Sequence, residues 1–328
     1  MPDPQRAGAG SGTGSATTSR GRIRTVNRMD GMRSVGRDWF GLDGFRPGPR
    51  FIRDGARVYL LDEVGSTNAF LRGRGEVATG RMCTWDGWGW QAGSESKLAP
   101  VTDLRPGTVV VARQQTAGQG RQGRPWLDCG GLNLSVVVPG HRAAFERGFS
   151  VWLGLQTVLV LREDYHLDAR LKWPNDIVVG RRKLGGILLE TTGTGNTARV
   201  VAGLGVNLDT RRGDFPSALR GQATSVRAEC GKAPRPGELA GHILTRVENG
   251  LDDFESTGWE PFRPALACLD ALLGRYIELV TGSGRHEGRA VGLDDQGRLL
   301  LETGDGTVRA FRGGDAHLVP SSSESGEA

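Results

Sequence analysis

Short stretches of aliphatic and β-branched residues, separated by Gly or Pro-Asn turns, recur through the middle of this 328-residue chain. Segments of this length and composition, bounded by turn residues, predict β-strands. The predicted strands are Thr108–Gln114, Asn133–Val138, Arg170–Trp173, Asp176–Val179, Lys183–Glu190 and Arg199–Leu208. Two longer apolar patterns, Phe149–Leu161 and the amphipathic Glu238–Phe254, predict helices. The middle of the chain therefore reads as an α+β domain.

The region before these strands opens with a predicted strand, Val58–Leu61, followed by a short helix, Ser66–Leu71. Ser66 or Thr67 is suited to cap that helix, because either hydroxyl can accept from a free backbone N–H. Residues 81–107 then hold three tryptophans among Gly and Ser. That composition is typical of a loop, and we interpret the segment as an insertion with no assigned function.

After about Leu273 the pattern changes to short strands joined by tight turns, with no helix. The predicted strands are Tyr276–Val280, His286–Leu293, Leu299–Glu302 and Val308–Phe311. About 45 residues of small antiparallel strands suggest a compact SH3-like barrel. We therefore predict a catalytic-type domain over residues 51–272, a small β domain over 273–320, and a disordered tail over 321–328.

The first 50 residues carry the positive charge of the chain. They hold nine arginines and four acidic residues, which equals the net charge of +5, so the remainder is neutral. This segment is rich in Gly, Ser and Thr and poor in aliphatic residues, so we predict a disordered basic tail over residues 1–50. A transit peptide is the alternative for such an Arg-rich, Ser-rich start. The neutral remainder excludes a whole-protein basic surface for DNA.

The four cysteines lie far apart and form no Cys-x-x-Cys pair, and no apolar run of 18 or more residues is present. We expect reduced thiols, no cysteine metal site, no membrane span and a cytoplasmic location.

A glycine-rich loop, Gln115-Thr-Ala-Gly-Gln-Gly-Arg-Gln-Gly-Arg-Pro-Trp126, follows directly after a predicted strand. Its glycines let the backbone approach a ligand closely, and Arg121 and Arg124 offer charge for a phosphate. The loop also spells G-x-G-x-x-G, but a dinucleotide-binding motif needs a helix to begin within the glycines. Pro125 and Trp126 interrupt here, so that interpretation fails. By itself the loop could equally be a solvated basic loop.

Further motifs follow in order. They are Lys172-Trp-Pro-Asn-Asp176, Lys183-Leu-Gly-Gly-Ile-Leu-Leu-Glu190 and Gly203-Leu-Gly-Val-Asn207, with Ser66-Thr67-Asn68 upstream and Ala223-Thr224-Ser225 later. Together with the glycine-rich loop, this order resembles the biotin protein ligases over about residues 55–320. The resemblance implies a mixed β-sheet with helices, the biotinyl/lipoyl ligase fold that is like class II aminoacyl-tRNA synthetases, plus an SH3-like C-terminal domain. It also implies that biotin is activated with ATP as biotinyl-5'-AMP and transferred to a lysine of the biotin carboxyl carrier domain of an acyl-CoA carboxylase.

The resemblance also implies roles for individual residues. Joining a carboxylate to the α-phosphate of ATP brings two anions together, so cations must neutralise both. The expected catalytic group is Lys183, Arg121, Arg124, Lys172 and Asp176. The expected nucleotide contacts are Arg121, Arg124, Lys172, Asn175, Asp176, Lys183 and Asn207, with Asp176 as a Mg²⁺ ligand. The expected biotin contacts are Ser66, Thr67, Asn68, Gln115, Gly118, Gln119, Gly120, Arg121, Lys183 and Gly186.

One position departs from the family pattern, which usually has Arg where this chain has Gln119. If that side chain pairs with an anion, one charge-assisted hydrogen bond worth roughly 1.5–3 kcal/mol is lost. If the position binds through its backbone, little changes, and we favour this second interpretation. Trp126 and Trp173 are interpreted as packing residues rather than ligands, with a ring near the face of biotin or adenine as the alternative.

Three alternatives to this function remain. A lipoate ligase performs similar chemistry on a similar fold, although the Lys172–Asp176 turn favours biotin. A bifunctional ligase and DNA-binding repressor needs an N-terminal helix-turn-helix of roughly 55–60 residues, and residues 1–50 show no helical periodicity. We therefore expect the ligase-only form, with no specific DNA partner, as a monomer or weak homodimer. A non-catalytic biotin-binding module would leave the cations unexplained.

Overall fold

The computed structural model describes residues 38–52, 57–139, 148–194 and 198–319. Most of the predicted N-terminal tail and all of the predicted C-terminal tail lie outside these ranges. Over the described residues, ten strands form one large sheet in the order β3-β2-β1-β5-β6-β10-β9-β8-β7, with β4 also paired to β2. The strands are β1 (Arg57–Val64), β2 (Ala78–Trp85), β3 (Trp90–Ala92), β4 (Ser96–Leu98), β5 (Val109–Gln115), β6 (Gly131–Val137), β7 (Ala169–Lys172), β8 (Asp176–Val179), β9 (Arg182–Thr192) and β10 (Arg199–Asn207).

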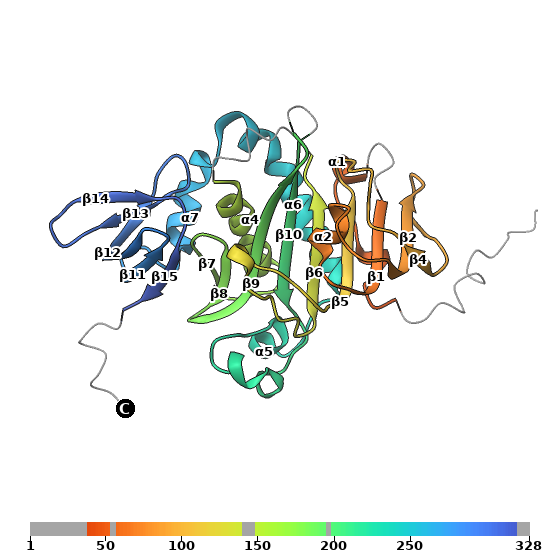
Figure 1. Ribbon diagram of the computed structural model, residues 1–328, viewed down its shortest axis with the longest axis horizontal. Coiled ribbons are helices and arrows are strands. Elements are labelled where there is room, and N and C mark those ends of the chain that lie inside the picture. The colour runs from red at the N-terminus through yellow and green to blue at the C-terminus, as the bar shows by residue number, and fades with distance from the viewer. Residues whose placement is uncertain (1–37, 53–56, 140–147, 195–197, 320–328) are drawn as a thin grey trace, which may run out of the picture. The chain divides into compact units, whose positions relative to one another are not determined.

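The large sheet is mixed, because β1 and β5 run parallel while the other described pairs are antiparallel. The strand β6 is the middle of this order, the long antiparallel strands β10 and β9 follow it, and β8 and β7 form one edge (Figure 1). The predicted α+β class with a mixed sheet is confirmed. The six strands predicted between residues 108 and 208 all form, with boundaries that differ by one or two residues.

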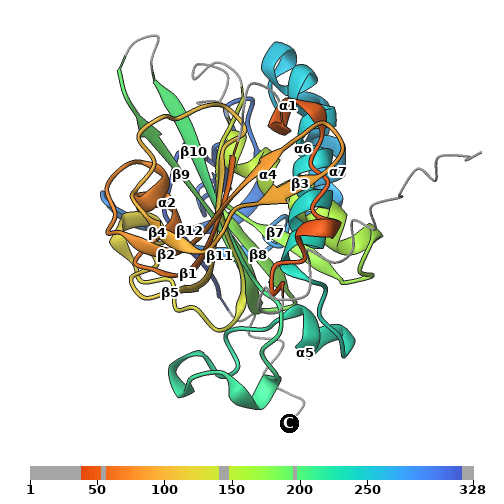
Figure 2. The same cartoon turned by 90° about the vertical axis from the view of Figure 1, so that its right-hand side faces the viewer.

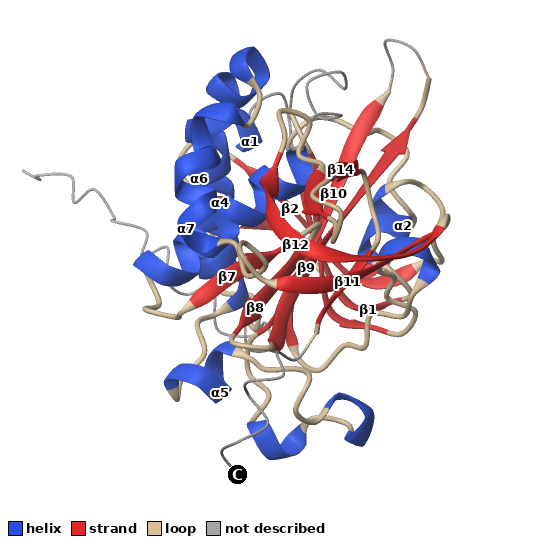
Figure 3. Cartoon of the chain, turned by 90° about the vertical axis from the view of Figure 1, so that its left-hand side faces the viewer, coloured by secondary structure: helices blue, strands red, loops and turns tan. Residues whose placement is uncertain are grey.

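Helices cover both faces of this sheet. They are α1 (Pro49–Ile52), α2 (Thr67–Leu71), α4 (Phe149–Glu163), α5 (Val226–Cys230), α6 (Pro236–Thr257) and α7 (Arg263–Leu269), with 3-10 turns at Leu42–Gly44, Arg121–Gly123, Arg212–Asp214, Ser217–Leu219 and Glu260–Phe262. Figures 2 and 3 show α4, α6 and α7 on one face and α2 on the other. The rings of Trp152 (α4) and Phe254 (α6) stack with their centroids 4.7 Å apart. Such a pair contributes about 0.5–1.5 kcal/mol beyond the burial of its surface.

A second, smaller sheet follows α7. Its five strands are all antiparallel, in the order β14-β13-β12-β11-β15. They are β11 (Tyr276–Thr281), β12 (Gly284–Leu293), β13 (Leu299–Glu302), β14 (Val308–Phe311) and β15 (Asp315–Leu318). The four strands expected from the sequence form. The fifth, β15, was not predicted, because its four residues carry too weak an alternation to register as a strand. The boundary at residue 272 between two domains stays a prediction.

The structure corrects two expectations about the N-terminal half. Residues 81–107 are not one loop, because they contain the end of β2 and the edge strands β3 and β4. The predicted tail also ends too late, because Phe40 and Phe45 are fully buried in the main core. The two departures share a contact. The indole Nε1 of Trp90 donates to the carbonyl of Phe45 at 2.8 Å, and the two rings stack at 5.5 Å.

The four cysteines are free thiols, as expected. Among the described residues, no helix combines the length and apolar character needed to cross a bilayer.

Candidate active site

A cavity of about 290 Å³ opens where the glycine-rich loop, the ends of α2 and β5, the strands β8 to β10 and the start of β15 meet. Thirteen predicted site residues line it. They are Ser66, Thr67, Asn68, Gln115, Gln119, Gly120, Arg121, Arg124, Lys172, Asn175, Asp176, Lys183 and Gly186. Gly118 and Asn207 are the two predicted residues that do not. The predicted residues, which are spread along the sequence from Ser66 to Gly186, therefore meet at one cavity.

Hydroxyls and amides form one side of the cavity. Ser66 caps α2, since its hydroxyl accepts from the backbone N–H of Ala69 at 3.5 Å. The next residue, Thr67, donates its backbone N–H to Oε1 of Gln115 at 2.8 Å. The amide nitrogen of Asn68 donates to Glu190 at 2.8 Å. Thr67 and Asn68 are each only 4% exposed, so these groups are held firmly before any ligand arrives.

The glycine-rich loop folds back on itself above the cavity. The backbone N–H of Trp126 donates to the carbonyl of Gly118 at 2.8 Å, and that of Gly120 to the carbonyl of Arg124 at 2.7 Å. Gly118 has a shaping role, because a Cβ there would lie 2.8 Å from the carbonyl oxygen of Trp126. Gln119 forms a backbone bridge with Pro125. That bridge fixes the backbone of Gln119 within the loop.

Trp126 lines the cavity, so it is more than the packing residue that we favoured from the sequence. Its ring lies against the backbone of Gly205 on β10, where a Cβ would meet ring carbon Cζ2 at 2.6 Å. Trp173, by contrast, is a packing residue for the most part, being 2% exposed, although it also borders the cavity. The second glycine of the G-x-G-x-N motif thus makes room for an indole ring.

Four cations surround the cavity. The ammonium Nζ of Lys183 lies 2.6 Å from Oδ1 of Asp176 and 5.8 Å from the centroid of the Trp126 ring. Burial lowers the pKa of Lys172, and the nearby Asp176 carboxylate opposes that change. Burial also lowers the pKa of Arg121, whose guanidinium lies 3.5 Å from Oδ1 of Asn175. Such a concentration of partly desolvated cations is suited to anionic ligands.

The fourth cation, Arg124, forms a two-contact ion pair with Asp315 of β15. Its hydrogen bond to Asp315 raises the pKa of Arg124, and the same contact lowers the pKa of Asp315. The small sheet thus supplies part of the cavity wall, through Gly314, Asp315, Ala316 and His317. No sequence motif pointed to these residues, because they lie far from the motifs and at a strand that was not predicted.

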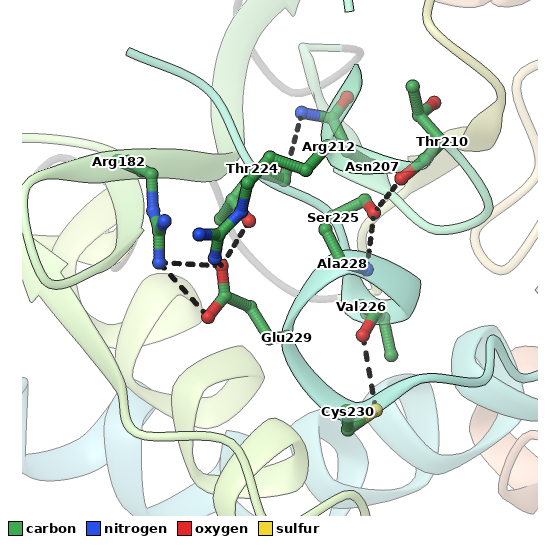
Figure 4. A network of polar contacts seen from close by, with 10 residues as sticks. All are labelled: Arg182, Asn207, Thr210, Arg212, Thr224, Ser225, Val226, Ala228, Glu229 and Cys230. Carbon is green, nitrogen blue, oxygen red and sulfur yellow. Dashed lines mark hydrogen bonds and ion pairs between the residues drawn. The ribbon is translucent and has the colours of Figure 1, made fainter. Parts of the chain in front are cut away.

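Asn207 lies behind the cavity, in a network at the end of β10 (Figure 4). Its amide nitrogen donates to the carbonyl of Thr224 at 2.9 Å, and Asn207 is 6% exposed. Glu229 is the centre of that network, because it accepts from Thr224 and forms ion pairs with Arg182 and Arg212.

This network holds the backbone of Lys183. The N–H of Lys183 donates to the carbonyl of Gln222 at 2.7 Å, and the N–H of Thr224 donates to the carbonyl of Lys183 at 2.9 Å. Thr224, which is 1% exposed, therefore connects Lys183 to the Glu229 network. The Ala223-Thr224-Ser225 motif has a structural explanation that its sequence alone did not supply.

No cluster of three or more His, Cys, Asp or Glu side chains suited to a metal ion occurs among the described residues. A metal held by one carboxylate and by substrate phosphates does not need such a cluster. Asp176, which borders the cavity, fits that more limited requirement.

Comparisons with known proteins agree with this site. A model described as the biotin/lipoate A/B protein ligase family matches residues 92–207, and one described as the biotin protein ligase C terminal domain matches residues 272–319. The chain is 33% identical over 222 residues to the biotin–[acetyl-CoA-carboxylase] ligase of Paracoccus denitrificans, covering 65% of this chain and 92% of that protein. It is 32% identical over 271 residues to the bifunctional ligase/repressor BirA of Escherichia coli K12, covering 81% and 75%.

A solved structure is also similar. The biotin protein ligase from Aquifex aeolicus, in complex with biotin and ATP, matches with a TM-score of 0.63 and 26% identity. That match covers 80% of this chain and 99% of the solved one. The cavity of hydroxyls, amides and cations, the two matched family models and these relatives lead to one conclusion: the chain belongs to the biotin protein ligase family.

Proposed function

We propose that the cavity forms biotinyl-5'-AMP from biotin and ATP and then transfers biotin to a lysine of a biotin carboxyl carrier domain. The observation that carries this proposal is the convergence of Lys183, Lys172 and Arg121 beside the polar groups of α2 and Gln115. A carboxylic cofactor with a polar ring and a nucleotide phosphate would each find complementary groups there.

In the first step, a carboxylate oxygen of biotin attacks the α-phosphorus of ATP. An O–P bond forms, the bond between the α-phosphorus and its bridging oxygen breaks, and pyrophosphate leaves. Lys183 lies between the two reacting anions and offsets their repulsion. Arg121 and Arg124 stabilise the phosphate charge that develops, and Lys172 adds charge toward the nucleotide.

Mg²⁺ would accompany ATP, with Asp176 as its protein carboxylate and the phosphates as its remaining anionic ligands. When bound, the ion neutralises phosphate charge and eases departure of pyrophosphate. Asp176 must then share or release Lys183, its ion-pair partner in the structure.

In the second step, the ε-amine of the acceptor lysine attacks the acyl carbon of the adenylate. A C–N bond forms, the acyl C–O bond to phosphate breaks, and AMP leaves while the amine loses a proton. Asp176 is placed to assist that proton transfer. The mixed anhydride hydrolyses readily in water, so closure of the glycine-rich loop over it preserves the intermediate.

Biotin would occupy the side formed by Ser66, Thr67, Asn68 and Gln115, with the loop glycines 118 and 120, Gln119 and Gly186 beside it. Asn175 would contact the nucleotide from the turn before β8. Asn207 does not line the cavity and donates to the carbonyl of Thr224, so it would support the nucleotide side from behind the cavity rather than by direct contact.

Two relatives are named as biotin–[acetyl-CoA-carboxylase] ligases, which supports the carrier domain of an acyl-CoA carboxylase as the acceptor. ATP and such carboxylases are available together in the cytoplasm, where we place the reaction. We expect the protein to act as a monomer or weak homodimer without a specific DNA partner.

An assay with a purified carrier domain tests the proposal. The full chain should incorporate labelled biotin, with ATP-dependent release of pyrophosphate, and should leave labelled lipoate unused. Incorporation of lipoate in preference to biotin would assign the chain to the lipoate branch. Biotin binding without pyrophosphate release would reduce the protein to a binding module.

A further inference from the structure

A line of hydrogen bonds runs from the cavity into the protein behind it. The backbone N–H of Thr67 donates to Oε1 of Gln115 at 2.8 Å. The amide nitrogen Nε2 of Gln115 donates to Oδ1 of Asn133 at 3.1 Å. The amide nitrogen Nδ2 of Asn133 then donates to Oδ2 of Asp128 at 2.7 Å. Gln115 lines the cavity, whereas Asn133 and Asp128 do not.

The two ends of this line determine its direction. A backbone N–H can only donate, and an ionised carboxylate can only accept. Gln115 must therefore turn its oxygen to Thr67 and its nitrogen to Asn133, and Asn133 must turn its nitrogen to Asp128. Both side-chain amides are held in one of their two orientations. An amide between two hydroxyls would have no such constraint, because hydroxyls both donate and accept.

Asn133 also holds the glycine-rich loop. Its Oδ1 accepts from Nε1 of Trp126 at 3.2 Å, in addition to the bond from Gln115. Asn133 is only 3% exposed, so a reversed amide would set its N–H groups against two donors without water to relieve them. Asp128 reinforces the arrangement by accepting the backbone N–H of Gln115 at 2.7 Å and that of Gly130 at 2.9 Å.

The cavity side of Gln115 then has a defined chemistry. Its Oε1 already accepts from the N–H and the hydroxyl of Thr67, at 2.8 and 3.1 Å. A primary amide nitrogen has two N–H groups, and Asn133 takes one of them. What Gln115 offers a ligand is therefore a donor, which selects a ligand acceptor.

We propose that Asp128 and Asn133 are positioning residues that fix Gln115 as a hydrogen-bond donor to the ureido carbonyl of biotin and hold Trp126 over the cavity. This inference rests on the proposed function for the identity of the ligand. It assigns specificity to a carboxylate that borders no part of the cavity.

The variant Asp128→Asn tests the direction of the line. An asparagine at 128 can donate as well as accept, so this end of the line no longer determines the orientation of the two amides, which then depends on the N–H groups of Thr67 and Trp126 alone. The dissociation constant for biotin, measured by calorimetry on the full chain, should rise roughly tenfold to a hundredfold. The KM for ATP should stay within about twofold, because the change acts on one substrate. Asp103→Asn, at an exposed ion pair with Arg105, is the matched control and should leave both values unchanged.

A second readout separates positioning from general damage. In 2-iminobiotin a cyclic guanidine replaces the ureido group, and because it is protonated at neutral pH, the acceptor is lost. The wild-type chain should strongly prefer biotin to 2-iminobiotin, and Asp128→Asn should reduce that preference by about tenfold. A structural defect would weaken both ligands together and leave their ratio unchanged.

The outcomes separate the two proposals. If the wild-type chain fails to bind biotin, the proposed function fails. If it binds biotin but Asp128→Asn keeps the affinity and the ratio of the two ligands, the positioning role is overturned. Should Asp128→Asn melt well below the wild type, Asn133→Ala replaces it, since this variant keeps the backbone bonds of Asp128. A folded Asn133→Ala with unchanged ligand preference would also overturn the inference.

Discussion

The ammonium of Lys183 and the carboxylate of Asp176 form an ion pair in the lining of the cavity, with Nζ 2.6 Å from Oδ1. Their side chains are 40% and 28% exposed, so the pair is screened by solvent and worth no more than about 1 kcal/mol. A substrate anion can therefore take Lys183 from Asp176 at little cost. The ion pair therefore holds the ammonium of Lys183 at the cavity and still leaves it available to a substrate anion.

Replacing Lys183 by Ala should lower the rate of biotin-dependent pyrophosphate release by roughly 10²–10³-fold, since a charge that meets the developing transition state is removed. Binding of biotin alone should weaken much less. Lys97→Ala is the control, because Lys97 is exposed and its ammonium donates to the hydroxyl of Thr79, which does not line the cavity. Equal rates for Lys183→Ala and the wild type would remove the role given to Lys183.

Loss of the charge of Lys172 should lower the rate of the first half-reaction at alkaline pH. Burial lowers the pKa of Lys172, so its charge is lost at a lower pH than that of an ordinary lysine, near 10.4. The value of kcat/KM for ATP, followed by pyrophosphate exchange, should fall as the pH rises through that lowered pKa. In Lys172→Arg the guanidinium stays charged, so this fall should move to higher pH or disappear. Superimposable profiles would show that Lys172 does not act through its charge.

Gly205 should be intolerant of a side chain. In Gly205→Ala the new Cβ would lie 2.6 Å from Cζ2 of Trp126, which displaces the indole ring. We expect the dissociation constant for biotin to rise about tenfold or more while the protein stays folded. The double variant Gly205→Ala with Trp126→Phe should recover part of the affinity, because a smaller ring relieves the contact. Gly304→Ala, where a Cβ meets nothing within 4 Å, is the control.

Asp270 should make stability depend on pH. Burial raises the pKa of Asp270 to about 6, and its Oδ1 accepts from the backbone N–H of Leu272 at 2.8 Å. Below the unfolded pKa near 3.9 the carboxyl is neutral in both states, and stability is then lost as the pH rises through about 6. Asp270→Asn keeps the acceptor and removes the charge. It should raise the free energy of unfolding by up to about 3 kcal/mol at pH 7.5, with little effect at pH 3.5.

Urea unfolding of the two proteins at both pH values checks this prediction. A difference between them that does not change with pH would contradict it.

Much of the fold was predictable where local pattern and tertiary role agree. The strands that carry the motifs are β-branched and bounded by Gly or Pro-Asn turns. Of the two long helices, α4 is apolar nearly all round and α6 has one apolar face. The strands β3 and β4 were missed because their sequence is rich in Gly and Ser and gains its structure only by pairing with β2. Phe40 and Phe45 were placed in a tail because their core partners lie elsewhere in the chain.

The residues of the site also fall into a predictable and an unpredictable group. Lys183 and Asp176 belong to motifs that occur in a recognisable order, so the sequence could predict that they lie at one site. Asp315 could not be predicted in this way, because only the folded chain brings it to Arg124 across 191 residues. Asn133 lay inside a predicted strand and seemed an ordinary strand residue, since a hydrogen bond to a ligand-facing amide leaves no pattern in sequence.

A hydrogen bond of Trp173 shows that the large sheet depends on the small sheet. Its indole N–H, fully enclosed, donates to the carbonyl of Gly297 at 3.0 Å. A chain cut before β11 would leave this donor without its acceptor, one residue away from Lys172. In shortened versions made for crystallography or engineering, the turn that carries Lys172 would therefore be disturbed. Such versions should retain the residues through β15.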